Sequence, residues 1–183
     1  MNVVRRRLLL GFCAIAPEAC APGAGSPPGD RSCATPSSGA GLPYCLVGAL
    51  SITFPNAREL MPGEVLLRGV DDNSAAILAR DAQGYFALSA TCPHACCTVS
   101  LCGGEACGRT TPTPNDCAVA LKGMLPVSGP AFLCPCHGSE FGPDGAVLKG
   151  PALSPLPSVR VLLGATDASV DLADAVDASV RFN

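Results

Sequence analysis

Two short motifs contain both histidines of this 183-residue chain, and they constrain its fold more than any other feature. The first, CPHACC, starts at Cys92 and supplies a C-x-H pair that ends at His94. The second, CPCHGS, starts at Cys134 and supplies a C-x-x-H pair that ends at His137. Cysteine thiolates and imidazoles are common metal ligands, so we expect the fold to bring the two motifs together around a metal centre.

Two thiolates and two imidazoles are the ligands of one kind of iron–sulfur centre, in which two histidines replace two cysteines on one iron. Each motif would supply one cysteine to the inner iron and one histidine to the outer iron. With two ferric ions and two sulfides, the formal charges sum to about zero, whereas an all-cysteine cluster is more negative. A neutral centre accepts an electron more easily, so the pattern predicts a redox site for mild donors.

Two other interpretations fit these residues less well. Zinc also binds Cys2His2 sites, but zinc fingers usually space their ligands as C-x2-4-C followed by H-x3-5-H, which is not the pattern here. A purely structural disulfide scaffold would account for the twelve cysteines but not for both histidines. We therefore expect Cys92, His94, Cys134 and His137 to be the metal ligands.

The two motifs resemble those of Rieske iron–sulfur proteins of the high-potential type, which is found in cytochrome bc complexes. That branch has an extra cysteine in each loop, and the two form a disulfide; here Cys97 and Cys136 match them. Ser139 matches a serine that donates a hydrogen bond to a cluster sulfide, and Phe141 stands where the family often has a tyrosine. Gly150-Pro151-Ala152 resembles the family's "Pro loop", which covers the cluster.

The resemblance covers roughly residues 44–183 and implies an all-β fold. That fold is a Rieske-like antiparallel β-sandwich base with a small cluster-binding subdomain at about residues 92–142. The resemblance also implies a [2Fe-2S] cluster as the cofactor and one-electron transfer as the activity, with His137 exposed and in contact with quinol. Such a protein is the electron-transfer subunit of an oxidoreductase rather than an enzyme alone.

The implied partners are a cytochrome b and a c-type cytochrome of a respiratory complex. A second interpretation is a small Rieske subunit or carrier of a periplasmic oxidoreductase, similar to the small subunit of arsenite oxidase. A third, from another class, is a disulfide-rich surface lipoprotein without redox activity. The net charge of −3 makes nucleic acid an unsuitable partner.

Residues 1–20 have the pattern of an export signal. Arg5, Arg6 and Arg7 precede an apolar run of about nine residues, far shorter than the roughly 20 needed to span a bilayer. Arginines followed by leucines resemble a twin-arginine signal, although three arginines also suit an ordinary Sec signal. Cys20 loosely resembles a lipoprotein acceptor cysteine, so a lipid anchor stays an open alternative.

Residues 21–43 are rich in Pro, Gly, Ala and Ser and predict a linker, either a tether for a moving head or a passive stalk. Twelve cysteines in a chain of this size favour an oxidising compartment. We therefore expect export to the periplasm or to the outer face of the cytoplasmic membrane.

The rest of the chain predicts short strands. Asp81 to Gly84 is a turn signal, and the hairpin around it leads directly into the first motif. The alternation at the C-terminal end predicts two half-buried edge strands, at 170–172 and 180–182. The other expected strands are at 46–54, 64–68, 75–80, 85–91, 131–133 and 156–163.

The stretch between the motifs, about residues 100–127, contains Cys, Gly, Thr and Pro without any periodicity. We expect a surface loop held by disulfides. Once the ligands, the inter-loop pair, Cys13 and Cys20 are set aside, six cysteines allow 15 connectivities, among which the sequence does not choose. These are Cys33, Cys45, Cys96, Cys102, Cys107 and Cys117.

Overall fold

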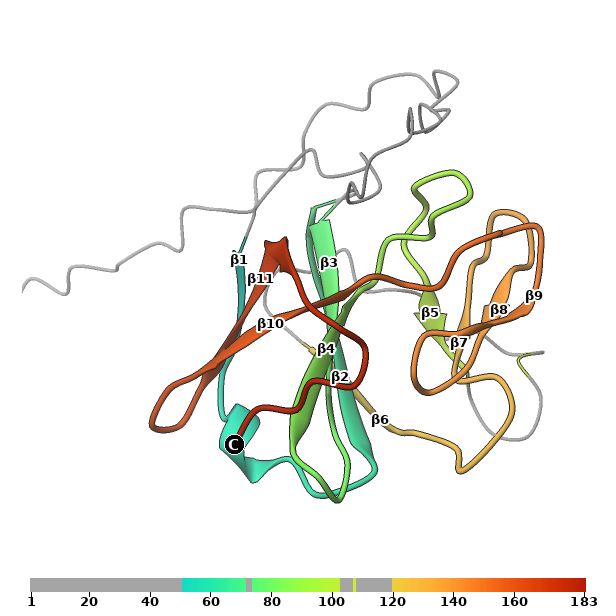
Figure 1. Cartoon of the computed structure of the whole chain (residues 1–183). Coiled ribbons are helices and arrows are strands. Elements are labelled where there is room, and N and C mark those ends of the chain that lie inside the picture. The colour runs from blue at the N-terminus through green and yellow to red at the C-terminus, as the bar shows by residue number, and fades with distance from the viewer. Residues whose placement is uncertain (1–50, 72–73, 103–106, 108–119) are drawn as a thin grey trace, which may run out of the picture.

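The computed structural model describes residues 51–71, 74–102, 107 and 120–183, and it confirms the all-β fold. One antiparallel sheet has the strand order β1-β11-β10-β4-β3-β2-β6, and a smaller antiparallel sheet has the order β5-β7-β8-β9. Figure 1 shows the smaller sheet beside the larger one. The elements are β1 (Ser51–Phe54), a 3-10 turn η1 (Ala57–Glu59), β2 (Glu64–Asp71), β3 (Ser74–Arg80), β4 (Tyr85–Ser89), β5 (Ser100–Leu101), β6 (Leu121–Met124), β7 (Phe132–Leu133), β8 (Glu140–Phe141), β9 (Val147–Lys149), β10 (Ser158–Leu163) and β11 (Ala168–Ala175).

The larger sheet folds back on itself and forms the sandwich-like base. Strand β1 contacts β2 and β3, and β11 contacts β3, although these strands are far apart in the order of the sheet. The side chains between the two halves form a closed core that includes Phe54, Leu78, Val161 and Leu172. The base therefore buries its own apolar face without help from the smaller sheet.

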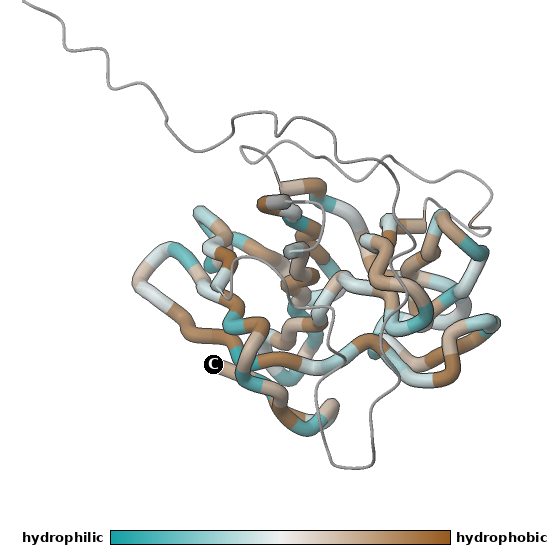
Figure 2. The backbone as a smooth tube through the Cα atoms, turned by 90° about the horizontal axis from the view of Figure 1, so that it is seen from above, coloured by the Kyte–Doolittle hydropathy of each residue, from teal (hydrophilic) through white to brown (hydrophobic). Residues whose placement is uncertain are grey.

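Strands β3 and β4 are buried on both faces, which explains their unbroken apolar sequences. Ala76 and Leu78 belong to the core inside the base, whereas Ile77 and Leu88 belong to a second core shared with the smaller sheet. A strand covered on both faces has no polar face, so the alternation of a half-exposed strand is lost. Figure 2 shows hydrophobic residues along the chain in many parts of the molecule.

Several sequence predictions are confirmed. The hairpin that leads to the first motif consists of β3 and β4, and the Asp81 carboxylate in its turn accepts the N–H of Gln83 and of Gly84 at 2.8 and 3.0 Å. The strands expected at 64–68, 131–133 and 156–163 are present as β2, β7 and β10. The expected segments 1–20 and 21–43, and the strand start at 46–50, lie outside the described residues.

Two strand predictions were wrong. The strand expected at 170–172 as an edge is β11, which lies inside the sheet because β1 pairs with its outer side. The segment 180–182 contributes only an isolated bridge between Tyr85 and Phe182. No helix in the described part of the chain is long and apolar enough to cross a membrane.

Strand β6 lies in the stretch expected to be a surface loop, and it pairs with β2. Its sequence, Leu-Lys-Gly-Met, has exposed side chains at Lys122 and Met124 and no Cβ at Gly123. A short edge strand of this kind gains its stability from pairing rather than from apolar alternation, so its sequence does not predict it.

Gly145, in the turn between β8 and β9, lies where the two sheets meet. A Cβ atom at this position would approach Leu88 Cδ1 to 3.1 Å and the Leu156 carbonyl oxygen to 3.2 Å. The Gly145 carbonyl also accepts the Leu156 N–H at 3.0 Å, and the Gly145 φ is +82°. Glycine is required here both by the left-handed backbone and by the close packing of the two sheets.

We predict that Gly145→Ala destabilises the protein about 1–3 kcal/mol more than Gly129→Ala, because overpacking adds to the cost of the backbone conformation. Gly129 is a matched control, with a φ of +84° and no atom within 4 Å of the position that a Cβ would take. The measurement is the free energy of unfolding in urea. Equal losses in the two variants would contradict this account of the contact between the sheets.

Candidate metal centre

The two motifs fold into loops with the same backbone hydrogen bonds. The Cys92 N–H donates to the carbonyl five residues ahead at 2.8 Å, and the Cys92 carbonyl accepts the N–H four residues ahead at 2.9 Å. Cys134 makes the same two bonds in the second loop, also at 2.8 and 2.9 Å. The loops are therefore two copies of one turn, and their residues correspond position by position.

The fifth residue of each loop has a left-handed backbone, with φ of 59° at Cys96 and 76° at Gly138. Glycine is the usual residue in this conformation because a Cβ atom disfavours it. Cys96 occupies the position nevertheless, and it is disulfide-bonded. The first loop therefore carries disulfides at two adjacent residues, Cys96 and Cys97.

The first residue of each loop is a buried free thiol. Cys92 and Cys134 are 0% and 1% exposed, and both belong to the core between the sheets, together with Phe132 and Phe141. Strand β4 ends shortly before Cys92, and β7 ends at Leu133, directly before the second thiol. Both sulfur atoms are thus mounted on strand ends inside a packed core.

The two thiols are hydrogen-bonded to each other. The Cys92 S–H donates to the Cys134 sulfur, which lowers the pKa of Cys134 to about 6 and, with burial, raises the pKa of Cys92 far above its usual value. In each loop the backbone N–H groups two and three residues ahead also donate to the sulfur. Four oriented N–H groups stabilise negative charge on the two sulfur atoms, which suits a pair of thiolates bound to a cation.

The two imidazoles lie together at the surface. His94 and His137 are exposed, and their ring centroids are 4.7 Å apart with an angle of 84° between the ring planes. The structure thus pairs the two thiols that the sequence predicts as ligands in the core, and it pairs the two predicted imidazole ligands at the surface.

A disulfide joins Cys97 in the first loop to Cys136 in the second, with an S–S distance of 2.03 Å and a Cα–Cα distance of 6.5 Å. This is the pair that the resemblance implied. The sulfur of Cys134 lies within 4.8 Å of both disulfide sulfurs. That trio is not a ligand set, because metal binding by cysteine requires a thiolate. A second disulfide, between Cys102 and Cys107, is one that the sequence left open.

Ser139, the last residue of the second loop, and Phe141, which follows it, are completely buried. The Ser139 Oγ accepts a hydrogen bond from the Ala152 N–H at 2.9 Å. The resemblance to the family indicated Ser139, but the sequence could not show this contact. The donor is the backbone N–H of Ala152, and every residue except proline has such a group. The structure thus gives Ala152, which the sequence analysis placed in the expected Pro loop, a direct hydrogen bond to the second loop.

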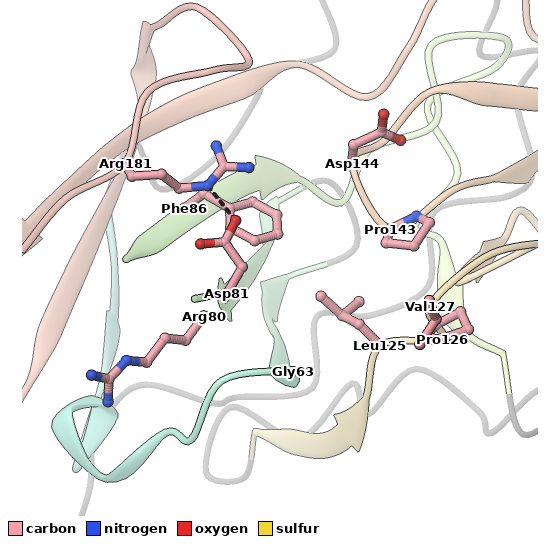
Figure 3. A pocket seen from close by; sticks show the side chains of 10 residues that line it. All are labelled: Gly63, Arg80, Asp81, Phe86, Leu125, Pro126, Val127, Pro143, Asp144 and Arg181. Atoms are coloured by element: carbon pink, nitrogen blue, oxygen red, sulfur yellow. Dashed lines mark hydrogen bonds and ion pairs between the residues drawn. The ribbon is translucent and has the colours of Figure 1, made fainter. Parts of the chain in front are cut away.

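The donor set fits a [2Fe-2S] cluster, since two buried thiols and two adjacent imidazoles are the ligands that such a centre requires. Figure 3 shows a separate open groove of about 280 Å³. In it the Arg181–Asp81 ion pair lies beside Phe86, across from Leu125 and Val127. None of the four expected ligands lines this groove.

The model of the Rieske [2Fe-2S] domain matches residues 52–160, so the chain belongs to the Rieske [2Fe-2S] domain family. Its cofactor is a [2Fe-2S] cluster, and the protein is a Rieske iron–sulfur electron-transfer protein. It is distantly related to the iron–sulfur subunits of cytochrome b6-f complexes.

Three relatives illustrate this relation. The chain is 60% identical over 30 residues to cytochrome b6-f complex iron-sulfur subunit 3 of Nostoc sp., which is 16% of this chain and 17% of that subunit. It is 32% identical over 108 residues to the chloroplastic subunit of Bigelowiella natans (58% of this chain, 31% of that one). It is 30% identical over 112 residues to the subunit of Synechococcus sp. (61% and 47%). The chain therefore spans less than half the length of each of these relatives.

Solved structures of Rieske proteins also overlap this chain in part. The plasma membrane Rieske protein PetC3 of Synechocystis PCC 6803 has 25% identity and a TM-score of 0.36, over 59% of this chain and 85% of that chain. A chain from the oxygenase–ferredoxin complex of carbazole 1,9a-dioxygenase has 16% identity and a TM-score of 0.39, over 70% and 98%. These overlaps are too loose to carry an argument about function.

We predict that replacing both Cys97 and Cys136 by serine destabilises the cluster-free protein by about 3–4 kcal/mol, since the disulfide closes a loop with a sequence separation of 39. The matched control replaces Cys102 and Cys107, whose separation of 5 predicts a loss of about 2 kcal/mol. Unfolding in urea measures both. A loss no larger than that of the control would contradict the extra stabilisation expected from the longer loop that the inter-loop disulfide closes.

Proposed function

We propose that this protein relays single electrons from quinol to a c-type cytochrome, as a subunit of a respiratory complex. The observation that supports it best is the pair of exposed imidazoles next to two buried thiols, in loops joined by a disulfide. The related cytochrome b6-f subunits add support for cytochrome partners. In this proposal the second loop meets the electron donor at the protein surface.

In this proposal Cys92 and Cys134 hold the inner iron, and His94 and His137 hold the outer iron. The [2Fe-2S] cluster supplies one-electron chemistry when it is bound. The burial of the thiols keeps water from the sulfur side of the site, whereas the exposed imidazoles can be reached by a partner. The ring nitrogen of His137 that does not bind iron would accept a hydrogen bond from quinol and hold its proton.

The second candidate is a small Rieske subunit or carrier of a periplasmic oxidoreductase, which would use the same site with another electron source. The arginines of residues 1–20 and the composition of residues 21–43 support export and a tether in both cases, to the periplasm or the outer face of the cytoplasmic membrane. Recovery of a cytochrome b with the affinity-purified protein supports the first candidate. Recovery of a periplasmic oxidoreductase supports the second. An exported lipoprotein without a cluster would recover neither.

We predict that His137→Ala and His94→Ala each abolish the Rieske EPR signal of the reduced protein, because each removes one of two imidazole ligands. Ser154→Ala changes an exposed side chain in the nearby 150–155 segment and serves as a control that keeps the signal. A full signal in either histidine variant would remove that residue from the ligand set.

We also predict that Phe141→Tyr raises the reduction potential. Hydrogen bonds to the sulfur atoms stabilise the reduced cluster, and a tyrosine here would add a hydroxyl that Phe141 lacks. The control is Phe86→Tyr, which adds a hydroxyl beside the groove of Figure 3 and is expected to leave the potential unchanged. An EPR-monitored titration measures both variants, and an unchanged potential in Phe141→Tyr would show that this position does not face a ligand sulfur.

A further inference from the structure

The segment 150–155, between β9 and β10, contacts the second loop through one inward-facing residue. Ala152 is its only buried member, at 3% exposure, whereas Pro151 and Leu153 on either side are exposed. The Ala152 N–H donates to the Ser139 Oγ at 2.9 Å in the protein interior. The end of the segment is held by the Leu156 N–H, which donates to the Gly145 carbonyl at 3.0 Å. Ala152 therefore touches the site from a segment that is anchored to the smaller sheet.

The bond from Ala152 uses only part of the hydrogen-bonding capacity of Ser139. A serine hydroxyl has one donor hydrogen and two acceptor lone pairs, and the Ala152 N–H occupies one lone pair. The hydroxyl hydrogen must then point away from Ala152. Ser139 is 0% exposed, and no protein acceptor for this hydrogen occurs among the described residues. A buried donor in this state needs a partner other than the described residues, and the cluster can be that partner.

The repeat of the two loops indicates where that partner lies. Ser139 is the sixth residue of the second loop and corresponds to Cys97 in the first, since each accepts the N–H of the first cysteine of its loop. The side chain of Cys97 reaches the opposite loop, where it bonds to Cys136. By this correspondence, we infer that the Ser139 hydroxyl faces the space between the loops, where the thiols of Cys92 and Cys134 meet.

We propose that the backbone amide of Ala152 is a positioning group that holds the Ser139 O–H toward a sulfur of the cluster. The inference rests on the proposed function and adds to it a role for the 150–155 segment. A hydrogen bond donated to sulfur stabilises the more negative, reduced state of the cluster. By restricting the hydroxyl to one orientation, the Ala152 amide raises the reduction potential without touching the cluster itself.

The test replaces the Ala152 amide by an ester, through incorporation of lactic acid at position 152 of the full chain by nonsense suppression. This change removes one N–H and keeps the methyl side chain. The same ester at Leu153, made with the α-hydroxy analogue of leucine, is the matched control, because the Leu153 N–H has no hydrogen bond among the described residues. Each ester is made with Ser139 present and with Ser139→Ala. The readout is the reduction potential from an EPR-monitored titration.

We expect the Ala152 ester to lower the potential, by no more than Ser139→Ala does, and the Leu153 ester to leave it unchanged. In the Ser139→Ala background the Ala152 ester should cause no further fall, because its effect passes through the serine. An unchanged potential in the Ala152 ester contradicts the proposal. An equal fall with and without Ser139 also contradicts it, since the amide would then act through the general fold.

The unsubstituted protein separates this proposal from the function on which it rests. If the reduced unsubstituted protein gives a Rieske EPR signal, the cluster site is supported, and the esters then test only the role of Ala152. If it gives no signal, both the proposed function and the role of Ala152 are contradicted. Ala152→Pro provides a second way to remove the N–H should the ester chain not fold. The prolyl variant is expected to lower the potential with Ser139 present and not in the Ser139→Ala background, and any other pattern overturns the proposal.

Discussion

The contact between the two Cys-Pro loops is the constraint on which the rest of this structure depends. Each loop is a tight turn that buries its first cysteine and exposes its histidine. Only when the loops face each other do the sulfur atoms of Cys92 and Cys134 meet in the core and the rings of His94 and His137 meet at the surface. The Cys97–Cys136 disulfide fixes that arrangement covalently. The two loops are therefore held in the arrangement that binds a cluster before the cluster is present, which lowers the conformational cost of binding it.

The base holds this contact in place because its central strands are packed on both sides. One face of β3 and β4 closes the core of the folded-back sheet, and the other face packs against the smaller sheet that carries the second loop. The first loop follows directly from β4, so it is continuous with the most buried part of the molecule. Gly145 allows the two sheets to approach where a side chain would separate them. The two loops with the candidate ligands are thus held in position by the apolar cores beneath them.

Much of this arrangement could be predicted from the sequence, because the informative residues are rare or strongly patterned. With only two histidines in the chain, the two motifs indicated which thiols and imidazoles would meet, and the turn at Asp81 indicated the hairpin that delivers the first loop. The edge assignment of β11 failed because strand order depends on long-range pairing, here with β1. The sequence did not predict the Ala152–Ser139 contact, because the donor is a backbone N–H and almost every residue type has one. The left-handed Cys96 was equally hidden, since cysteine gives no signal for that conformation.

The most direct test of the central claim is an EPR-monitored redox titration of the whole chain purified under native conditions. A Rieske cluster with neutral imidazole ligands and sulfur-directed hydrogen bonds should be reduced by a mild reductant. We predict that the Rieske signal appears with ascorbate. A signal that requires dithionite would contradict a high-potential centre fed by quinol, and the absence of a signal with zinc bound in its place would contradict the cluster site itself.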